Sequence, residues 1–319
     1  MNRRSLLALP ALATLARPAL AQARPTRLIV PFPAGGGTDA VSRLFAPLLG
    51  QRLGTTVVIE NRPGAGGIPA TEVVVRAPAD GLTLLLATSS IHSTAPATGA
   101  NLPYDVEADF TPLALIGSSP SLVLVSKTVP VNDLRGFIAW AKARRGQVNY
   151  GSSGVATTPH LNGALLDSLA DLGMVHVPYR GTGAVYAELL RGDVHALLDV
   201  PATAATHIQS GTVKALAVTS AQETPLAPGV PTAEAAGLPG LISETWFGIF
   251  GPAGMPADLA SRISQAAQDA MADPELRARL LGLGVAPRAG DGQALAAAAR
   301  QERERWTDLV RRLNIRAAD

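Results

Sequence analysis

The sequence contains no cysteine, few aromatic residues and, beyond its first residues, no long apolar run. The absence of cysteine excludes a disulfide framework, a thiolate nucleophile and a thiolate metal site. Aromatic residues make up 4% of a chain that is 47% hydrophobic, so we expect cores built from Ala, Val and Leu, as in many α/β proteins. No later apolar stretch reaches the ~18 residues that a transmembrane helix needs.

The first residues have the layout of a secretory signal peptide. Met1–Ser5 is a short basic start, Leu6–Ala16 is apolar, and Ala21–Ala23 provides small residues at a cleavage point. The apolar run is too short and too interrupted for a membrane span. We therefore place the signal peptide over residues 1–23, the start of the mature chain at Arg24, and the protein in the periplasm.

Charge bears on the export route and on possible partners. The paired Arg3 and Arg4, with Arg17 near the cleavage point, favour a twin-arginine signal, and general secretion stays open as the alternative. Removing residues 1–23 removes these three arginines and no acid, so 27 basic and 25 acidic residues become 24 and 25. A nearly neutral mature chain has no basic field for nucleic acid or anionic membranes.

Short apolar strands alternate with helical patterns along the mature chain, which is the signature of parallel βαβ units. The first hundred residues follow the order β-α-β-α-β, and Thr38 or Asp39 is a natural N-cap for the first helix. The predicted strands and helices, in that order, are Arg27–Phe32, Asp39–Leu53, Thr56–Glu60, Ile68–Arg76 and Thr83–Ala87.

A second unit of the same kind begins near Leu122, and its first helix runs from an Asn132 cap to about Arg145. Pro225–Gly240 is too rich in proline and glycine to be a core element. Further helices start near Pro159 and lie near Ala184–Arg191 and Thr203–Ser210. The predicted strands are Leu122–Ser126, Val148–Tyr150, Val175–Pro178, Ala196–Val200 and Lys214–Val218.

The C-terminal segment contains essentially one strand followed by three helices. It cannot bury its apolar faces alone, so we expect it to pack back on the first unit. Lobe 1 is then residues 24–120 plus 244–319, and lobe 2 is residues 121–243. Two chain crossings between lobes make a hinge, and a hinge implies a ligand cleft that closes. The predicted elements are the strand Trp246–Phe250 and the helices Pro256–Ala272, Pro274–Leu283 and Gln293–Leu313.

The loop Pro33–Thr38 lies between a predicted strand and a predicted helix and contains three consecutive glycines. Its backbone N–H groups can converge on one point beside the positive helix N-terminus, so it predicts an anion site that needs no basic side chain. A dinucleotide-binding fold is the alternative, with Gly35, Gly37 and Glu60 in suitable places. Ala40 at the third motif position and the export signal argue against it.

Hydroxyl-bearing residues follow other predicted strands. Thr88–Ser90 follows a strand of lobe 1, and lobe 2 has a matching set; the carboxyl ends of parallel strands face the ligand crevice in open α/β sheets. A second glycine-rich stretch, residues 62–67, is either a structural turn or a ligand loop. The lobe 2 set is Ser152, Ser153, Thr157, Thr158, His160, Tyr179–Thr182 and Asp199.

A hydrolase is the catalytic alternative, with Ser152 or Ser153, His160 and Asp199 as a triad. The nucleophile-elbow pattern fails because Val155 stands at the position of its last glycine. The five histidines show no metal-ligand spacing. We therefore expect no catalytic residue, no metal site and no cofactor.

A series of segments in order along the mature chain carries a family pattern. The segments are Arg27–Phe32, Gly35–Asp39 with Arg43, Val58–Gly67, Asp80–Gly81, Leu102–Asp105, Asp109–Phe110, Asn149–Gly154, His160–Leu161, Val175–Tyr179, Gly181, Ala215–Ser220, Val230–Thr232 and Trp246–Gly248. This series resembles the solute-binding proteins of tripartite tricarboxylate transporters, the TctC or Bug family. So many matches in order make the resemblance specific.

The resemblance implies a type II periplasmic binding protein, an α/β fold with two βαβ lobes joined by a two-crossing hinge. It implies a small carboxylate deep in the cleft, held by the first glycine loop and the corresponding loop of lobe 2, and integral membrane transporter subunits as partners. We expect a monomer. The implied ligand-binding residues are Phe32, Ala34, Gly36, Gly37, Thr38, Ser89, Ser90, Ser153, Thr157, His160, Tyr179, Gly181 and Asp199.

Two departures from the family pattern concern the predicted site. Arg180 stands where a lysine is usual, and residues 92–99 replace a stretch that usually carries an Asn-Pro pair. The ligand of a better-known relative is therefore not transferred. Transport is the predicted function. An exported sensor of the same fold that signals to a two-component kinase is the alternative, and an exported α/β hydrolase is the third hypothesis.

Overall fold

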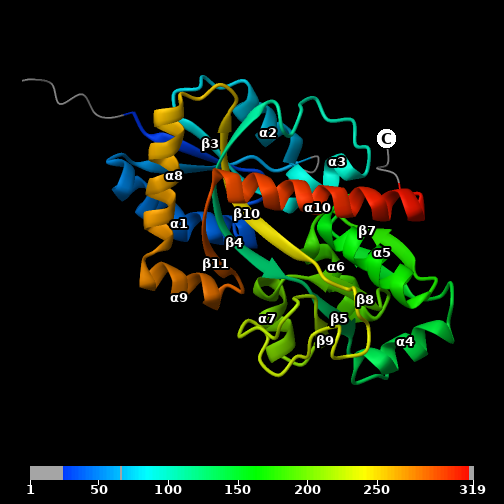
Figure 1. Ribbon diagram of the computed structural model, residues 1–319. Helices are drawn as coiled ribbons and strands as arrows, with labels where there is room; N and C mark the ends of the chain where they lie inside the picture. Colours follow the sequence, from blue (N-terminus) through cyan, green and yellow to red (C-terminus); the bar gives the residue numbers. More distant parts are fainter. Residues whose placement is uncertain (1–23, 65–66, 316–319) are drawn as a thin grey trace, which may run out of the picture.

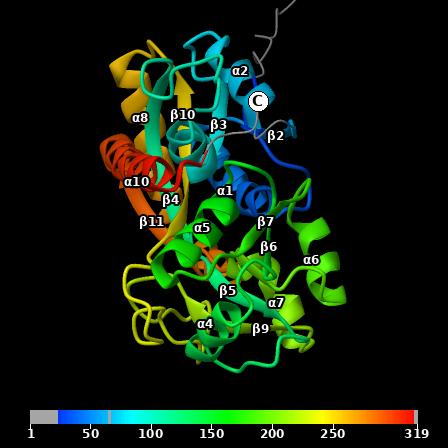
Figure 2. The same cartoon turned by 90° about the vertical axis from the view of Figure 1, so that its right-hand side faces the viewer.

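The computed structural model describes residues 24–64 and 67–315, so the predicted signal peptide over residues 1–23 lies outside the described residues. Within them the chain forms two β-sheets, each flanked by helices, which lie one above the other (Figure 1; Figure 2). The predicted α/β class is therefore confirmed.

The first sheet has six strands in the order β11-β4-β10-β3-β1-β2. β1 pairs in parallel with β2 and β3, whereas β10 pairs antiparallel with β3 and β4. Leu28 and Leu84 of the parallel strands are fully buried and share a core with Phe45 of α1. The strands are β1 (Thr26–Val30), β2 (Val57–Asn61), β3 (Thr83–Thr88), β4 (Phe110–Pro120), β10 (Glu244–Pro252) and β11 (Ala286–Asp291). The helices of this part are α1 (Gly37–Leu53), α2 (Ile68–Val75), η2 (Ser90–Thr94), α3 (Ala95–Ala97), α8 (Ala257–Met271) and α9 (Pro274–Gly282).

The second sheet has five strands in the order β7-β6-β8-β5-β9. β6 pairs in parallel with β7 and β8, and β5 runs antiparallel to β8 and β9. The strands are β5 (Leu122–Ser126), β6 (Asn149–Ser152), β7 (Val175–Pro178), β8 (Ala196–Asp199) and β9 (Val213–Val218). The helices are α4 (Leu134–Lys142), α5 (Thr158–Ala170), α6 (Thr182–Arg191) and α7 (Pro201–Gln209).

The sequence does not predict β4 or β11. β4 contains Pro112, Gly117 and Pro120 and lacks an alternating pattern, but it is paired on both sides, to β10 and β11. β11 is a polar edge strand whose register against β4 is irregular. The prediction of one strand in the C-terminal segment is therefore wrong, because an edge strand of this kind carries no apolar signal.

The start of α4 also differs from the prediction. Its N-cap is Asp133, whose carboxylate accepts the Gly136 N–H at 2.7 Å, and not Asn132. Aspartate and asparagine are both good N-caps, so composition alone did not separate two adjacent candidates.

The chain passes between the sheets twice. β4 ends at Pro120 in the first sheet, directly before β5 of the second, and β10 begins at Glu244, which pairs with Pro120. Thr219 connects the crossings, because its hydroxyl accepts the Ser121 N–H at 2.9 Å and donates to the Ser243 carbonyl at 2.5 Å. The division into lobes at 120/121 and 243/244 stays a prediction.

The last helix, α10 (Gly292–Leu313), contributes to the cores of both sheets. Leu295 and Ala299 lie in a core beside the first sheet, while Trp306 and Leu309 lie in the core that α4, α5 and the second sheet form. Figure 1 shows this helix extending from the first sheet toward α5. α10 is therefore a link between the two sheets in addition to the two crossings.

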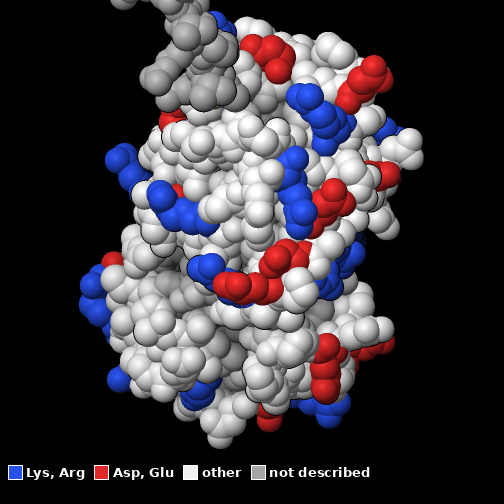
Figure 3. Space-filling view, turned by 90° about the vertical axis from the view of Figure 1, so that its left-hand side faces the viewer, with Lys and Arg blue, Asp and Glu red and all other residues white. Residues whose placement is uncertain are grey.

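The surface mixes charges of both signs. On the face in Figure 3, basic and acidic side chains are interspersed, as the nearly equal numbers of the two kinds predict. Across residues 24–64 and 67–315, no helix combines the length and the apolar composition that crossing a bilayer requires. The same part of the chain contains no cluster of three or more His, Asp or Glu side chains placed to hold a metal ion.

Candidate ligand-binding site

The predicted site residues lie at the carboxyl ends of parallel strands. β1 and β3 are parallel neighbours, so the β1–α1 loop and the residues after β3 share one edge of the first sheet. β6, β7 and β8 are parallel, so the loops that follow them share one edge of the second sheet. This is the edge at which open α/β sheets bind ligands.

One carboxylate, that of Asp39, holds the β1–α1 loop. Gly36 is the N-cap of α1, so Asp39 lies in the first turn and not at the predicted cap position. Asp39 Oδ2 accepts the Gly35 N–H and the Arg43 Nε–H, both at 2.8 Å, and Oδ1 accepts Asn61 Nδ2–H at 2.9 Å. The loop is therefore built around a negative charge that belongs to the protein.

This network also fixes the charge state. Burial raises the pKa of Asp39, but the hydrogen bonds, that from Arg43 above all, outweigh burial and hold the pKa below its usual range. Asp39 stays ionised at neutral pH at the positive end of α1. Asn61 Nδ2 also donates to the Phe32 carbonyl at 3.1 Å, which connects β2 to the loop. Phe32 is half-buried and Ala34 is exposed.

The loop offers fewer amides to a ligand than its glycines indicate. Gly35 donates to the carboxylate just described, and Gly36 donates to the Pro33 carbonyl at 3.3 Å. The amides of Gly37 and Thr38, in the first turn of α1, have no acceptor within the described residues. These two half-buried groups are the donors that remain for an anion at this helix N-terminus.

Ser89 and Ser90 follow β3 and reach the second sheet's side of the molecule. Ser90 begins η2, a π-helical turn of the kind that is frequent at functional sites. Its hydroxyl oxygen lies 3.0 Å from that of Thr158, the first residue of α5, and the Ser89 oxygen lies 3.5 Å from the same atom. Hydroxyls at the strand edges of the two sheets are thus in contact.

The β6–α5 loop, residues 153–157, is closed on itself and on the β7–α6 loop. The Thr157 hydroxyl donates to the Gly154 carbonyl at 2.7 Å. The Tyr179 N–H donates to the carbonyl of the last residue of β6 at 2.9 Å, and the Gly181 N–H donates to the Ser153 carbonyl at 3.3 Å. These bonds bring together four predicted residues of the second sheet, all half-buried.

His160, in the first turn of α5, is buried and stacks on the ring of His176 at a centroid distance of 3.8 Å. Its Nδ1 accepts the Ala156 N–H at 3.1 Å, so the neutral ring carries its proton on Nε2. Burial lowers the pKa of His160 to about 4. At neutral pH, His160 is therefore a neutral hydrogen-bond donor.

Asp199, at the end of β8, is 5% exposed. Its Oδ2 accepts hydrogen bonds from the hydroxyls of Tyr186, at 3.1 Å, and Thr203. Burial raises the pKa of Asp199, and these two donors oppose that rise. No hydrogen bond within the described residues joins Asp199 to the 153–157 loop or to the first sheet. Asp199 shares the strand edge with the other predicted residues without a hydrogen bond to them among the described residues.

The hydrolase hypothesis requires a serine–histidine–aspartate chain of hydrogen bonds. In residues 24–64 and 67–315 this chain is not formed: His160 Nδ1 is engaged by the Ala156 amide, and Asp199 by the Tyr186 and Thr203 hydroxyls. A triad needs the aspartate on one ring nitrogen and the serine on the other.

The residues that suggested a dinucleotide site, and those of the second glycine-rich stretch, also have roles in holding the fold together. Glu60, the candidate ribose acid, pairs with Arg27 at 2.7 Å and Arg62 at 2.5 Å. Residues 65–66 lie outside the described residues. Gly67 has φ 95°, a left-handed conformation that favours glycine, and a Cβ there would lie 2.9 Å from Ile91 Cδ1, so conformation and packing together account for this glycine without a ligand.

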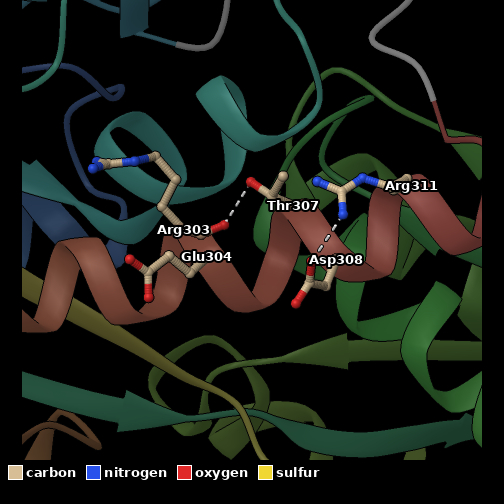
Figure 4. Close-up of a pocket in the computed structure, with 5 residues that line it drawn as sticks. All are labelled: Arg303, Glu304, Thr307, Asp308 and Arg311. Atoms are coloured by element: carbon tan, nitrogen blue, oxygen red, sulfur yellow. Dashed lines mark hydrogen bonds and ion pairs between the residues drawn. The ribbon is translucent and has the colours of Figure 1, made fainter.

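A hollow on the surface of α10 is a further candidate (Figure 4). The Thr307 hydroxyl donates to the Arg303 carbonyl at 2.8 Å, and Arg311 pairs with Asp308 at 3.4 Å. Small-molecule sites bring polar groups from separate elements onto one ligand, whereas this lining comes from one helix. We therefore place the candidate site at the strand edges. The lining residues are Arg303, Glu304, Thr307, Asp308 and Arg311.

Comparison with protein families is decisive about the kind of protein. A family model described as "Tripartite tricarboxylate transporter family receptor" matches residues 41–315. The chain belongs to this family. The resemblance to the TctC or Bug solute-binding proteins is thereby confirmed.

Solved structures agree with the family. The periplasmic binding protein BugD is 31% identical with a TM-score of 0.83, over 92% of this receptor and 99% of BugD. MatC from Rhodopseudomonas palustris with bound malate is 33% identical with a TM-score of 0.82, over 90% and 99% of the two chains. An R. palustris protein with adipate is 31% identical with a TM-score of 0.86, over 92% and 98%. The predicted periplasmic binding protein fold is confirmed.

Sequence reasoning missed residues that support the receptor's loops. Asp39 and Arg43 have the i,i+4 spacing of a helical ion pair, and that signal could have identified the network. His176 carries no comparable signal, because its role depends on a strand register that pairs it with Tyr150. Thr158 belongs to the predicted lobe 2 set of hydroxyls but not to the implied ligand-binding residues, and only the fold shows that its hydroxyl is the one that meets Ser90.

Proposed function

We propose that this receptor captures a small carboxylate between the strand edges of its two lobes and delivers it to integral membrane subunits of a tripartite transporter. The observation that supports this most is the contact between Ser90 and Thr158, which joins a strand end of one sheet to a helix start of the other. Two lobes that are connected by chain crossings and meet through polar edges can close around a ligand.

The chemistry of the edges favours an anion bound by neutral donors. Lobe 1 offers the amides of Gly37 and Thr38, and lobe 2 offers hydroxyls and the His160 Nε2–H. Two relatives of this receptor are solved with malate and adipate, which are both carboxylates. Asp199 suits a ligand hydroxyl or ammonium as a hydrogen-bond partner, because a buried carboxyl disfavours a second carboxylate nearby.

We propose the periplasm as the location and a monomer as the working form, with residues 1–23 as the export signal. The solved relative BugD is a periplasmic binding protein. We further propose that the receptor catalyses no reaction, in line with a family of solute receptors. Cell fractionation of the full-length chain, compared with a chain that lacks residues 1–23, tests the location.

Thermal unfolding with a carboxylate panel tests the binding function. Malate, adipate and related di- and tricarboxylates are compared with the matched diamides, after native mass spectrometry has shown the protein to be free of co-purified ligand. A bound carboxylate at ~100 times its Kd should add about 2.7 kcal/mol to the free energy of unfolding, and its diamide should add little. No stabilisation across the panel would contradict the proposal.

Deletion of the gene separates transport from signalling. Loss of carboxylate uptake with normal gene induction supports delivery to a transporter. Normal uptake with lost induction supports the sensor that signals to a two-component kinase. Turnover of any ester or amide that Ser153→Ala abolishes would support the exported hydrolase instead.

A further inference from the structure

A second histidine lies behind the predicted site. His176, on β7, has its Nε2 2.7 Å from the Ser152 hydroxyl oxygen, at the end of β6. The same Ser152 oxygen accepts the Gly154 N–H at 3.2 Å and lies 2.9 Å from the Gly154 carbonyl. The Ser152 hydroxyl therefore connects His176 to the first turn of the 153–157 loop.

The other end of this loop is strained, and it also depends on His176. Ala156 has φ 63°, a left-handed conformation that costs a non-glycine residue free energy and that clusters at functional sites. The Ala156 N–H is held by His160 Nδ1, and the His160 ring lies flat against the His176 ring, with an interplanar angle of 12°. Both ends of the loop thus lead to one side chain.

The position of His176 is itself well defined. In the register of β6 and β7, His176 pairs with Tyr150, and the centroids of these two rings lie 5.0 Å apart. Tyr150 packs closely on α5, since a Cβ on Gly163 would lie 2.3 Å from that ring. Tyr150, His176 and His160 therefore form a stack that is anchored on two strands and a helix.

The stack works only with neutral imidazoles, because a protonated His160 could not accept the Ala156 N–H. Burial lowers the pKa of His176 to about 4, and the neighbouring His160 adds to this. The other titratable groups at the stack are Tyr150 and Asp167 of α5. Burial raises the pKa of Tyr150, and the negative charge of Asp167 raises it further. No cation is therefore placed behind the loop at neutral pH.

We propose that His176 is a positioning residue for ligand binding, which sets the 153–157 loop in its binding geometry through Ser152 and His160. This rests on the proposed function, because the loop is the lobe 2 part of the carboxylate site. His176 touches no ligand. Its effect on affinity is transmitted chiefly by the hydroxyl of Ser152 at one end of the loop, and to a smaller extent by the ring of His160 at the other.

Two substitutions separate the hydrogen bond from the stack. His176→Phe keeps an aromatic ring against His160 and loses the polar contact with Ser152. His176→Gln loses the ring and keeps a polar group where Nε2 was. The matched control is His195→Phe, because His195 is likewise a histidine that hydrogen-bonds to β6: its Nδ1 accepts the Asn149 N–H at 2.9 Å, at the opposite end of that strand from Ser152.

Two readouts are measured on the full mature chain. Calorimetric titration with malate and adipate gives Kd, and amide hydrogen exchange without ligand gives the protection of residues 153–157. We expect His176→Phe to raise Kd and to speed loop exchange by about tenfold each, with the melting temperature little changed. His176→Gln should stay within about threefold of the native protein, and His195→Phe should alter neither readout.

The outcomes decide between positioning and simple packing. Native exchange of residues 153–157 in His176→Phe overturns the proposal, as does equal damage in His176→Gln and His176→Phe. If the native protein binds neither malate nor adipate, the proposed ligand class is in question, and the exchange readout still decides the role of His176. The proposal is supported if His176→Gln keeps a nearly native Kd and nearly native exchange of residues 153–157, while His176→Phe exchanges faster.

Discussion

The two loops that face the proposed ligand are held by opposite kinds of chemistry. The β1–α1 loop is organised by an ionised group, Asp39, which binds a loop amide, Arg43 and Asn61. The 153–157 loop is organised by neutral groups, the Ser152 hydroxyl and the His160 ring. In the proposed function, the anion binds between a β1–α1 loop whose internal charge is balanced by Arg43 and a 153–157 loop that contains no charged residue.

This difference teaches where the site is robust. The pKa of Asp39 is lowered, so the first loop keeps its charge network in mild acid. The pKa of His160 and of His176 is also lowered, but for a histidine this means that acid eventually adds a charge where a neutral acceptor is needed. We therefore expect the β1–α1 loop to keep its hydrogen bonds in acid and the 153–157 loop to lose the hydrogen bond that His160 accepts.

The largest predicted effect concerns Glu302, which lies outside both loops. Burial raises the pKa of Glu302 to about 7 from its ordinary 4.5, and Trp306 Nε1 donates to the carboxylate at 3.0 Å. Stability from the protonated group is full below pH 4.5 and is lost as pH rises through 7. Glu302→Gln should therefore raise the free energy of unfolding by roughly 3 kcal/mol at pH 8 and change it little at pH 4.

Urea unfolding at the two pH values measures this effect. The control is Glu304→Gln, because Glu304 is exposed on the same helix. Equal changes in the two variants at pH 8 would contradict the assignment. If the effect is confirmed, the Glu302→Gln variant becomes the protein in which to measure how acid affects the two loops. In that variant the titration of Glu302 no longer changes the stability in the opposite direction.

The next effect breaks the charged side of the comparison. Asp39→Ala removes the acceptor of three donors, so we expect a loss of about 2 kcal/mol in the free energy of unfolding and weaker carboxylate binding. The matched control is Glu72→Ala, which breaks the exposed i,i+4 pair with Arg76 and should cost less than about 0.5 kcal/mol. A stable Asp39→Ala variant with native affinity would show that the β1–α1 loop needs no internal charge.

A third prediction sets the loops against each other in acid. The lowered pKa values of the histidine pair mean that its contribution to stability is full above pH 6.5 and is lost as pH falls through about 4. Exchange at residues 153–157, corrected for intrinsic rates, should accelerate about tenfold between pH 6.5 and pH 4. Exchange at residues 33–38 should change little, because Asp39 remains ionised. Equal acceleration in both loops would remove the distinction.

The smallest predicted effect concerns the contact between the two edges. Thr158→Val keeps the shape of the side chain and removes the hydroxyl that meets Ser89 and Ser90. We expect the Kd for a bound carboxylate to rise about threefold, the scale of one neutral hydrogen bond. Thr98→Val is the control, because its hydroxyl donates only to a nearby carbonyl, that of Ala95, and not to a residue of the other sheet. Similar Kd changes in both variants would speak against an edge-to-edge contact in the liganded state.

Sequence patterns predicted the strands that carry buried apolar runs, and with them the order of the site loops. They missed β11, which is a polar edge strand, and β4, whose short apolar run Leu113–Ile116 stands between Pro112 and Gly117. The predicted site residues follow from strand ends, because parallel strands end at a common edge. The supporting groups do not: His176 and Thr158 matter through partners distant in sequence, and α10 reaches both cores only in the folded chain.

The central claim is that one carboxylate binds both strand edges at once. Amide chemical shifts in a transverse-relaxation-optimised NMR spectrum, recorded while malate or adipate is added, test this most directly. The account predicts that a single titration, with one Kd, shifts the amides of Gly37 and Thr38 together with those of residues 153–157. Shifts confined to one sheet, or to the α10 hollow around Arg303 and Arg311, would contradict it.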